Sequence, residues 1–473
     1  MTKKMTVTNP RYRLGYHIQA PAGWINDPNG FCYFKGYYHI FYQHHPYSQD
    51  WGPMHWGHAR SKDLVHWETL PIAIAPDTPN DEDGCFSGSA IVKDDILYLI
   101  YTGHHYYGDN DPDHFWENQN LAYSKDGIHF EKYDQPIIDK APEDNTHHFR
   151  DPKVWEEKGH YYLVLGSQEE DGLGRVLLYT SDNLLDWEYV GKIAKSQKVE
   201  TEGYMWECPD FFSLNNGEEE KHILLFSPQG VKADGKDYLN IFETGYLVGD
   251  YDKATHTLHR GSFKEIDRGH DFYASQTTLT PDGRRVVFGW MDMWESDFPE
   301  KADGWAGALT LPRELNLVGD QLQMIPAREL VKLRTSTLAE AQETVAAPTI
   351  LLAGQKQAEL GLTLDQPGDF TLVFQGDAAD PFLTLHYTAD TKEWQLHRPD
   401  KETDRFVQSQ TDERVNVHLF LDTSSAEFFI NNGETTFTER FYVEEDYQVI
   451  LQPTSETAID YATYTLSGDA VQY

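Results

Sequence analysis

Cysteine is scarce in this sequence, whose 473 residues include three, Cys32, Cys85 and Cys208. Small folds that rely on disulfides usually carry an even number of cysteines at characteristic spacings. An odd count with wide gaps therefore argues against a secreted fold held together by disulfides. The length is sufficient for two or three domains, each with its own apolar core.

Basic residues are also few. The chain has 39 Lys and Arg against 77 Asp and Glu, which gives a formal net charge of −38. Such a charge repels the phosphates of nucleic acids and the surface of anionic membranes. The sequence therefore predicts no nucleic-acid partner and no membrane partner, and it favours a neutral small-molecule ligand.

Long apolar runs are missing as well. No stretch is long and apolar enough to span a bilayer, and the first ten residues lack the apolar core of a secretory signal. We therefore expect a cytoplasmic protein, while the sequence leaves its oligomeric state open. Aromatic residues, by contrast, are abundant, with 12 Trp, 28 Tyr and 24 Phe. They fit both an aromatic-rich β core and platforms on which sugar rings stack.

Five strand-like runs recur along the chain, at 37–42, 96–101, 161–165, 222–226 and 285–290. Measured between Tyr38, Tyr98, Tyr162, Leu224 and Val287, their spacings are 60, 64, 62 and 63 residues. A fixed period of this length, made of short strands and Gly/Asp turns, is typical of a propeller. We predict an all-β protein in which residues 1–330 form a five-bladed β-propeller.

The pattern changes after Trp290. Residues 331–348, which include a stretch rich in Ala, Thr and Glu, are predicted to be a linker. From 349 to 473, short and partly alternating runs are bounded by Gly, Asp, Asn and Pro, which is typical of antiparallel strands. We predict a C-terminal β-sandwich of ordinary domain size.

Three acidic motifs, at 24–30, 149–152 and 206–210, each set a carboxylate close to an aromatic residue and a proline. Asp27, Ser87 and Asp151 each precede the anchor of their repeat by eleven residues. Glu207 precedes its anchor by seventeen residues and Tyr273 by fourteen. Equivalent positions in successive blades share one height, so we expect these side chains to converge at one mouth of the central channel.

Carboxylates gathered in this way suit glycoside hydrolysis, in which a retaining enzyme needs a nucleophile and an acid/base about 5–5.5 Å apart. Asp27, between an amide and a turn, can accept hydrogen bonds that keep it ionised as the nucleophile. Glu207, beside Trp206 and other acids, is the better candidate for the protonated acid. Asp151 follows Arg150, whose charge favours the ionised form, and this suits a residue that grips sugar hydroxyls and faces positive charge in the transition state.

Taken together, the motifs resemble glycoside hydrolase family thirty-two, the β-fructofuranosidase family of invertases, sucrose-6-phosphate hydrolases and fructan hydrolases. The resemblance covers nearly the whole chain, through residues 24–30, 41–43, 51–59, 85–90, 149–152, 206–210, 271–276, 289–291 and 422–433. It implies a five-bladed propeller followed by a β-sandwich, in agreement with the repeat. By the same resemblance, Asp27 is the nucleophile, Glu207 the acid/base and Asp151 the transition-state stabiliser. The fructose pocket is implied to include Trp24, Asn26, Gln43, Trp51, Phe86, Ser87, Arg150, Tyr273 and Trp290.

The predicted substrate is sucrose or a short fructo-oligosaccharide, cleaved through a fructosyl-enzyme. A sucrose-6-phosphate hydrolase is the alternative, but a phosphate favours Lys or Arg at the outer subsite. Residues 103–119, which we expect near the mouth, contain four acids and no Lys or Arg. A fructosyltransferase uses the same carboxylates and stays open. A propeller lectin without catalysis is disfavoured because Asp27 and Glu207 are both present.

Two further features invite a functional interpretation. The histidine pairs at 44–45, 104–105 and 147–148 suggest metal ligands, but neighbouring residues on a strand point to opposite faces. We therefore predict no metal site, and no cofactor. Cys208 fits both a residue that tunes Glu207 and a small buried side chain, and the sequence does not separate the two.

Overall fold

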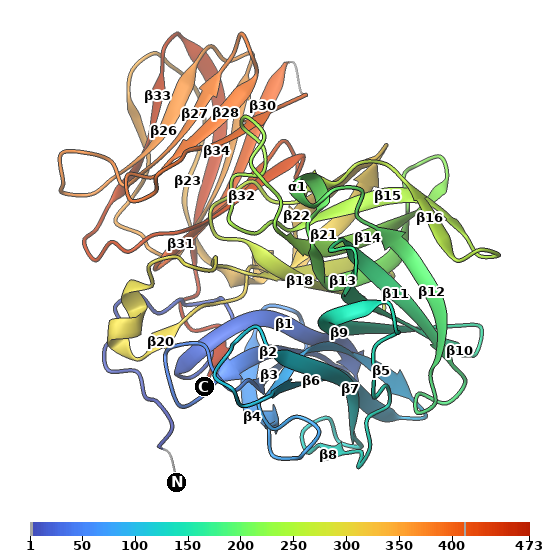
Figure 1. Cartoon of the computed structure of the whole chain (residues 1–473). Coiled ribbons are helices and arrows are strands. Elements are labelled where there is room, and N and C mark those ends of the chain that lie inside the picture. The colour runs from blue at the N-terminus through green and yellow to red at the C-terminus, as the bar shows by residue number, and fades with distance from the viewer. Residues whose placement is uncertain (1–2, 411–412) are drawn as a thin grey trace.

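The computed structural model describes residues 3–410 and 413–473, and the regular secondary structure of these residues consists almost entirely of antiparallel β-sheets (Figure 1). Strands β1 to β22 form five sheets in chain order, to which we refer together as the propeller. Strands β23 to β34 form two further sheets, the sandwich. No helix within the described ranges is long and apolar enough to cross a bilayer.

The first three propeller sheets follow the sequence repeat. The first contains β1 Gly23–Phe34, β2 Tyr37–His45, β3 His55–Ser61 and β4 Trp67–Ile74, with β20 Trp305–Ala306 and β35 Val471–Gln472 at its edges. The second contains β5 Gly84–Lys93, β6 Ile96–Tyr106, β7 Phe115–Ser124 and β8 Glu131–Lys132. The third contains β9 Asn145–Glu157, β10 His160–Glu169, β11 Gly174–Ser181 and β12 Glu188–Lys195.

Two more sheets complete the propeller. After the short helix α1 Val199–Glu202, the fourth contains β13 Met205–Asn215, β14 Glu220–Gln229, β15 Gly245–Asp252, β16 Thr257–Arg260 and β17 Lys264–Glu265. The fifth contains β18 Tyr273–Leu279, β19 Arg285–Trp290, β21 Arg313–Val318 and β22 Gln321–Pro326, and the 3₁₀ helices η1 Pro299–Asp303 and η2 Arg328–Leu333 lie nearby in the chain.

The first strands of the five sheets contact one another in sequence. β1 contacts β5, β5 contacts β9, β9 contacts β13 and β13 contacts β18, and β18 contacts β1 in turn. The inner strands therefore close a ring, and each is followed by strands that lie progressively farther from it. The predicted central position of the strands that carry Asp27, Ser87, Asp151, Glu207 and Tyr273 agrees with this arrangement.

The sandwich consists of two six-stranded sheets. One contains β23 Arg334–Val345, β34 Thr457–Leu466, β25 Ala358–Asp365, β30 Arg414–Asp422, β31 Ser425–Ile430 and β32 Thr435–Arg440. The other contains β24 Thr349–Ala353, β33 Gln448–Pro453, β26 Phe370–Gln375, β27 Leu383–Thr388, β28 Glu393–His397 and β29 Arg405–Gln408. Alternating apolar side chains from both sheets, such as Leu360, Phe374, Trp394 and Phe428, form one shared core.

The predicted linker at 331–348 differs from the structure. Residues 334–345 of this stretch are strand β23, which pairs along its length with β34. Ala, Thr and Glu are polar or small, and β23 is an edge strand whose side chains are mostly exposed, so it lacks the apolar alternation that marks a strand in sequence. The connection between propeller and sandwich is accordingly the short segment around η2.

Candidate active site

Each of the five inner strands carries a β-bulge or register shift in its first half or at its middle. In the first four, two residues stand opposite one residue of the neighbouring strand: Asn26 and Asp27, Phe86 and Ser87, Asp151 and Pro152, and Cys208 and Pro209. In β18 the register shifts at Ala274. Bulges re-aim side chains and are frequent beside active sites. Here they place one functional position of every repeat at the same level of the ring.

Backbone conformation supports these bulges. Asp151, Cys208 and Ala274 adopt left-handed φ angles of 66°, 49° and 49°. Residues other than glycine rarely adopt this region, and such strain is concentrated at functional sites. The three residues occupy the bulges of consecutive inner strands, so the strain marks the same site as the carboxylates.

Three donors orient the carboxylate of Asp27. Asn26 Nδ2 donates to Oδ1 at 3.0 Å, and Ser87 Oγ donates to Oδ2 at 2.6 Å. The thiol of Cys208 approaches the same Oδ2 at 3.4 Å. Asn26 is itself held by the indole of Trp24, whose Nε1 donates to Asn26 Oδ1 at 2.7 Å. The orientation of Asp27 is therefore fixed from three different inner strands.

Asp151 faces the same sulfur from the other side. Its Oδ2 accepts a hydrogen bond from the backbone N–H of Cys208 at 2.9 Å and lies 3.7 Å from the sulfur. Burial and the neighbouring Asp27 and Asp151 raise the pKa of Cys208 well above its usual value. The thiol thus stays protonated, and its single hydrogen can be donated to Asp27, which is nearer, or to Asp151. The sequence alone could not decide this role.

The expected ionisation of Asp151 differs from the structure. Burial and the nearby charge of Glu207 raise the pKa of Asp151 well above its usual value. Arg150 opposes this shift, as its place in the sequence indicates, but it does not outweigh the other two effects. The reason is that the Arg150 guanidinium points to Glu207, so its charge is shared with a competing carboxylate.

Glu207 lies between Arg150 and Tyr273. Arg150 donates to Glu207 Oε1 from Nε at 3.0 Å and from Nη2 at 2.7 Å. The hydroxyl of Tyr273 donates to the other oxygen, Oε2. The Glu207 side chain keeps about 15% of its surface accessible, so substrate can reach it.

Further polar residues surround Arg150 on the cavity wall, and the sequence did not predict their contacts with it. Glu117 Oε2 is 3.5 Å from Arg150 Nη1 and accepts a hydrogen bond from the N–H of Phe149 at 2.9 Å. Although burial opposes it, Arg150 and His104 lower the pKa of Glu117 to about 2. Burial, aided by Arg150, lowers the pKa of His148 to about 3, and its neutral Nδ1 accepts from Arg150 Nη1 at 2.9 Å.

These residues line one cavity of about 390 Å³. Ten of the twelve residues proposed from the sequence lie on its wall: Asn26, Asp27, Gln43, Trp51, Phe86, Ser87, Arg150, Asp151, Glu207 and Tyr273. The segment 103–119 also reaches it, as expected, through His104, Tyr106, Pro112, Asp113, Phe115 and Glu117. Residues that the sequence did not assign to the pocket are His148, Tyr204, Gln229, Phe242 and Trp294. His148 belongs to the histidine pair at 147–148, whereas the other four lie outside the shared register of the repeat and gave no signal.

The other two residues proposed for the pocket, Trp24 and Trp290, are almost fully buried and lie behind the wall. Their rings are 5.7 Å apart, and Trp24 stacks on Trp294, which does line the cavity. Both rings also contact Phe298, which does not line the cavity, so these two residues support the wall from behind.

Histidines 104 and 105 show why adjacent pairs make poor metal ligands. His104 stacks on Phe86 at 4.2 Å on the cavity side, whereas His105 stacks on Trp116 at 3.8 Å on the other face of the strand. Among the residues that the structure describes, no group of three or more His, Cys, Asp or Glu side chains is arranged to hold a metal ion.

The arrangement of propeller, sandwich and carboxylates can be compared with known families. Residues 17–326 match the family model "Glycosyl hydrolases family 32 N-terminal domain", and residues 329–465 match "Glycosyl hydrolases family 32 C terminal". The chain belongs to glycoside hydrolase family 32. The boundary between the two matches falls at the start of η2.

Several family 32 relatives are similar over most of their length. A sucrose-6-phosphate hydrolase of Zymomonas mobilis is 40% identical, with 91% of this chain and 87% of the relative covered. A raffinose invertase of Escherichia coli is 39% identical, with coverage of 96% and 92%. A β-fructofuranosidase of Bombyx mori, solved as a variant in complex with sucrose, superposes with a TM-score of 0.87 at 38% identity, with 98% and 96% covered. This family 32 chain is accordingly a glycoside hydrolase that acts on β-fructosides.

Proposed function

We propose that this chain hydrolyses terminal β-D-fructofuranosides with retention of configuration, and that sucrose and short fructo-oligosaccharides are its substrates. The observation that carries the proposal is the placement of Asp27 and Glu207 on the wall of one cavity, where Cys208, the neighbour of Glu207, also contacts Asp27 at 3.4 Å. Retaining glycosidases use two carboxylates about 5–5.5 Å apart.

In the first step, Asp27 attacks the anomeric carbon of the fructosyl unit while Glu207 gives its proton to the leaving oxygen. The bond from carbon to the leaving oxygen breaks, and an ester to Asp27 forms. In the second step, Glu207 takes a proton from water, the water oxygen attacks the same carbon, and Asp27 is released as a carboxylate. Asn26 and Ser87 keep the attacking oxygens oriented throughout.

We assign Asp151 to the sugar hydroxyls and to the positive charge that develops on the ring. Its carboxyl is fixed by the N–H of Cys208 and lines the same wall as Asp27 and Glu207. Burial favours the neutral form of Asp151, in which its carboxyl can donate to a sugar oxygen. As positive charge develops in the transition state, the ionised form becomes more favourable.

The stereochemical outcome tests the assembled site. If Asp27 forms a covalent intermediate, two inversions give net retention, and NMR in the first minutes of sucrose hydrolysis should show β-fructofuranose before it mutarotates. Appearance of the α anomer first would mean that a water attacks directly. In that case the carboxylates are separated widely enough to hold that water, and the nucleophile assignment is wrong.

The charges of the cavity bear on the choice between sucrose and sucrose-6-phosphate. Its lining includes the carboxyl groups of Asp27, Asp113, Glu117, Asp151 and Glu207. Among the described lining residues, Arg150 is the one whose side chain is a Lys or an Arg. Arg150 is already engaged by Glu207 and Glu117. A phosphate dianion would therefore meet acidic side chains and an arginine that is already paired, which supports an unphosphorylated substrate.

We expect kcat/KM for sucrose to exceed that for sucrose-6-phosphate by about 10-fold or more, which corresponds to about 1.4 kcal/mol. Steady-state kinetics with both sugars at matched, low ionic strength will measure this. A preference for the phosphorylated sugar would instead support the second candidate, a sucrose-6-phosphate hydrolase, the name carried by several relatives. Kestose in the same assay, with product analysis, measures the share of fructosyl transfer.

We also propose an architecture for the chain. We assign residues 1–330 to a five-bladed propeller, because five sheets follow the sequence period and their inner strands close a ring. The sandwich then begins at β23 instead of residue 349. For location, we propose the cytoplasm, supported by three free, buried cysteines.

A further inference from the structure

The sandwich holds the segment that leads into the last inner strand. Residues 267–272, the lead-in segment, end immediately before β18 and run beside β32 of the sandwich. The N–H of Arg268 donates to the carbonyl of Thr436 at 2.8 Å, and the N–H of Asp271 donates to that of Thr438 at 3.1 Å. The N–H of His270 donates to Glu439 Oε1 at 2.9 Å. The sandwich therefore supplies the backbone partners of this propeller segment.

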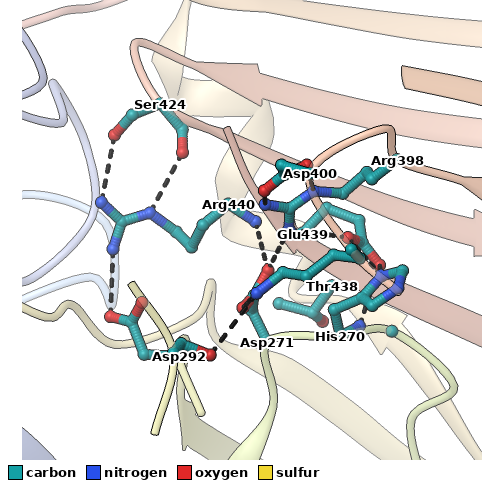
Figure 2. A network of polar contacts seen from close by, with 12 residues as sticks. His270, Asp271, Asp292, Arg398, Asp400, Ser424, Thr438, Glu439 and Arg440 are labelled. Carbon is teal, nitrogen blue, oxygen red and sulfur yellow. Dashed lines mark hydrogen bonds and ion pairs between the residues drawn. The ribbon is translucent and has the colours of Figure 1, made fainter. Parts of the chain in front are cut away.

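Asp271 is the charged centre of this contact (Figure 2). Its Oδ2 accepts from Arg398 Nη1 at 2.5 Å and from the N–H of Arg440 at 2.7 Å. Burial opposes ionisation of Asp271, but Arg398, Lys401 and His270 outweigh it and lower its pKa to about 2. Arg398, which follows β28, is also buried and is oriented by Asp400 through two further hydrogen bonds. Both sheets of the sandwich therefore donate to Asp271, one through Arg398 and the other through Arg440.

Two residues after Asp271 stands Tyr273, whose hydroxyl donates to Glu207. The Tyr273 side chain is 1% exposed, and Ala274 beyond it is held in the left-handed bulge. Asp271 and Tyr273 are therefore joined by a short stretch of backbone with little freedom. A displacement of Asp271 would be transmitted to the hydroxyl that contacts Glu207.

Arg440 fixes a second wall of the cavity in the same way. Its guanidinium lies 3.1 Å from Asp292, and Ser424 of the sandwich accepts from it as well (Figure 2). The same guanidinium lies 3.4 Å from Glu300. Asp292 and Glu300 flank the segment that carries the cavity residue Trp294. The sandwich is in this way connected to two of the segments that shape the site.

We propose that Arg398 of the sandwich is a positioning residue for catalysis, which acts through Asp271 and Tyr273 on the acid/base Glu207. The proposal rests on the function assigned to Glu207 above. It gives the sandwich a part in the reaction itself, in addition to any contribution to stability. Arg398 does not line the cavity, so it acts on the substrate only through these residues.

The test is a double-mutant cycle of Arg398→Gln with Tyr273→Phe, measured as kcat and KM on sucrose. We expect Arg398→Gln to lower kcat about 10-fold with little change in KM, and to lower it less than about 2-fold further once Tyr273 is already Phe. The basic limb of its pH–rate profile should move to higher pH, because the ionised form of Glu207 loses a donor. Additive losses, or an unchanged profile in a folded variant, would overturn the proposal.

Controls separate positioning from stability. Arg334→Gln removes an ion pair with Glu359 inside the sandwich, away from the lead-in segment, and should lower the Tm without moving the pH profile. If Arg398→Gln leaves Asp271 unpaired and does not fold, the pair Asp271→Asn with Arg398→Gln removes both charges and is compared in its place. Wild-type kinetics in that double variant would equally contradict the proposal.

A substrate-free measurement keeps this inference distinct from the proposed function. Hydrogen exchange at the amide of Asp271 in the unliganded enzyme should be faster in Arg398→Gln than in the wild type and in Arg334→Gln. Unchanged exchange would show that Arg398 does not hold the segment. If the wild type does not cleave β-fructosides, the proposed function fails, and this comparison still reports on the coupling.

Discussion

Asp27→Asn is expected to retain the fold and to lose roughly 10³-fold or more in kcat on sucrose, in line with the removal of a covalent nucleophile. The amide is nearly isosteric with the carboxylate, so Asn26 and Ser87 still pack around it. One of these two donors then faces the NH₂ group of the new side chain and loses its acceptor. Steady-state kinetics together with circular dichroism and a thermal melt will measure the two effects separately.

Asp95→Asn provides a matched control, because its carboxylate lies on the surface with 77% of the side chain exposed. It should behave as the wild type. Turnover of a folded Asp27→Asn variant within a few-fold of the wild type would show that another group attacks the sugar.

Glu207→Ala should have an effect that depends on the leaving group. On sucrose, which needs a proton on the departing oxygen, kcat should fall roughly 10²–10⁴-fold. On β-fructosyl fluoride the leaving group needs no proton, so one equivalent of fluoride should be released rapidly as the fructosyl-enzyme forms. The second step is then slow because no base activates water.

Azide distinguishes the two roles of Glu207, because this anion attacks without a general base. Its addition should restore turnover of the fluoride in Glu207→Ala and yield a fructosyl azide. Equal losses on sucrose and on the fluoride, with no burst and no azide effect, would show that Glu207 acts neither as the acid nor as the base.

The propeller strands could be anticipated because its period is written in the chain. The run at 161–165 predicts a strand that the structure shows as part of β10, and the eleven-residue offset of Asp27, Ser87 and Asp151 places them on consecutive inner strands. The sequence repeats in this way because each sheet packs in the same manner against its two neighbours. The family resemblance added the roles of individual residues, which spacing alone does not give.

What could not be anticipated depends on contacts between distant segments. The pairing of Arg150 with Glu207 joins two inner strands and is not implied by the Arg150–Asp151 dipeptide. The position of Cys208 between Asp27 and Asp151 results from a β-bulge. The residues around Cys208 have no sequence preference that predicts this bulge. Strand β23 was not predicted for a related reason. It is a strand because it pairs with residues more than a hundred positions away, and its own sequence pattern does not indicate one.

The outer edge of the first sheet is covered by a strand that is synthesised late. Its outer strand β4 pairs with β35, where Val471 lies opposite Trp67 and the N–H of Trp67 donates to the carbonyl of Ala470 at 2.8 Å. The ribosome makes these residues about 400 positions after β4, which takes roughly 20–80 s at ordinary elongation rates. Throughout that interval the nascent chain presents an uncovered strand edge, the kind of surface that recruits foreign strands. Chaperone dependence should therefore persist until β35 has been made, and slowing elongation should prolong it.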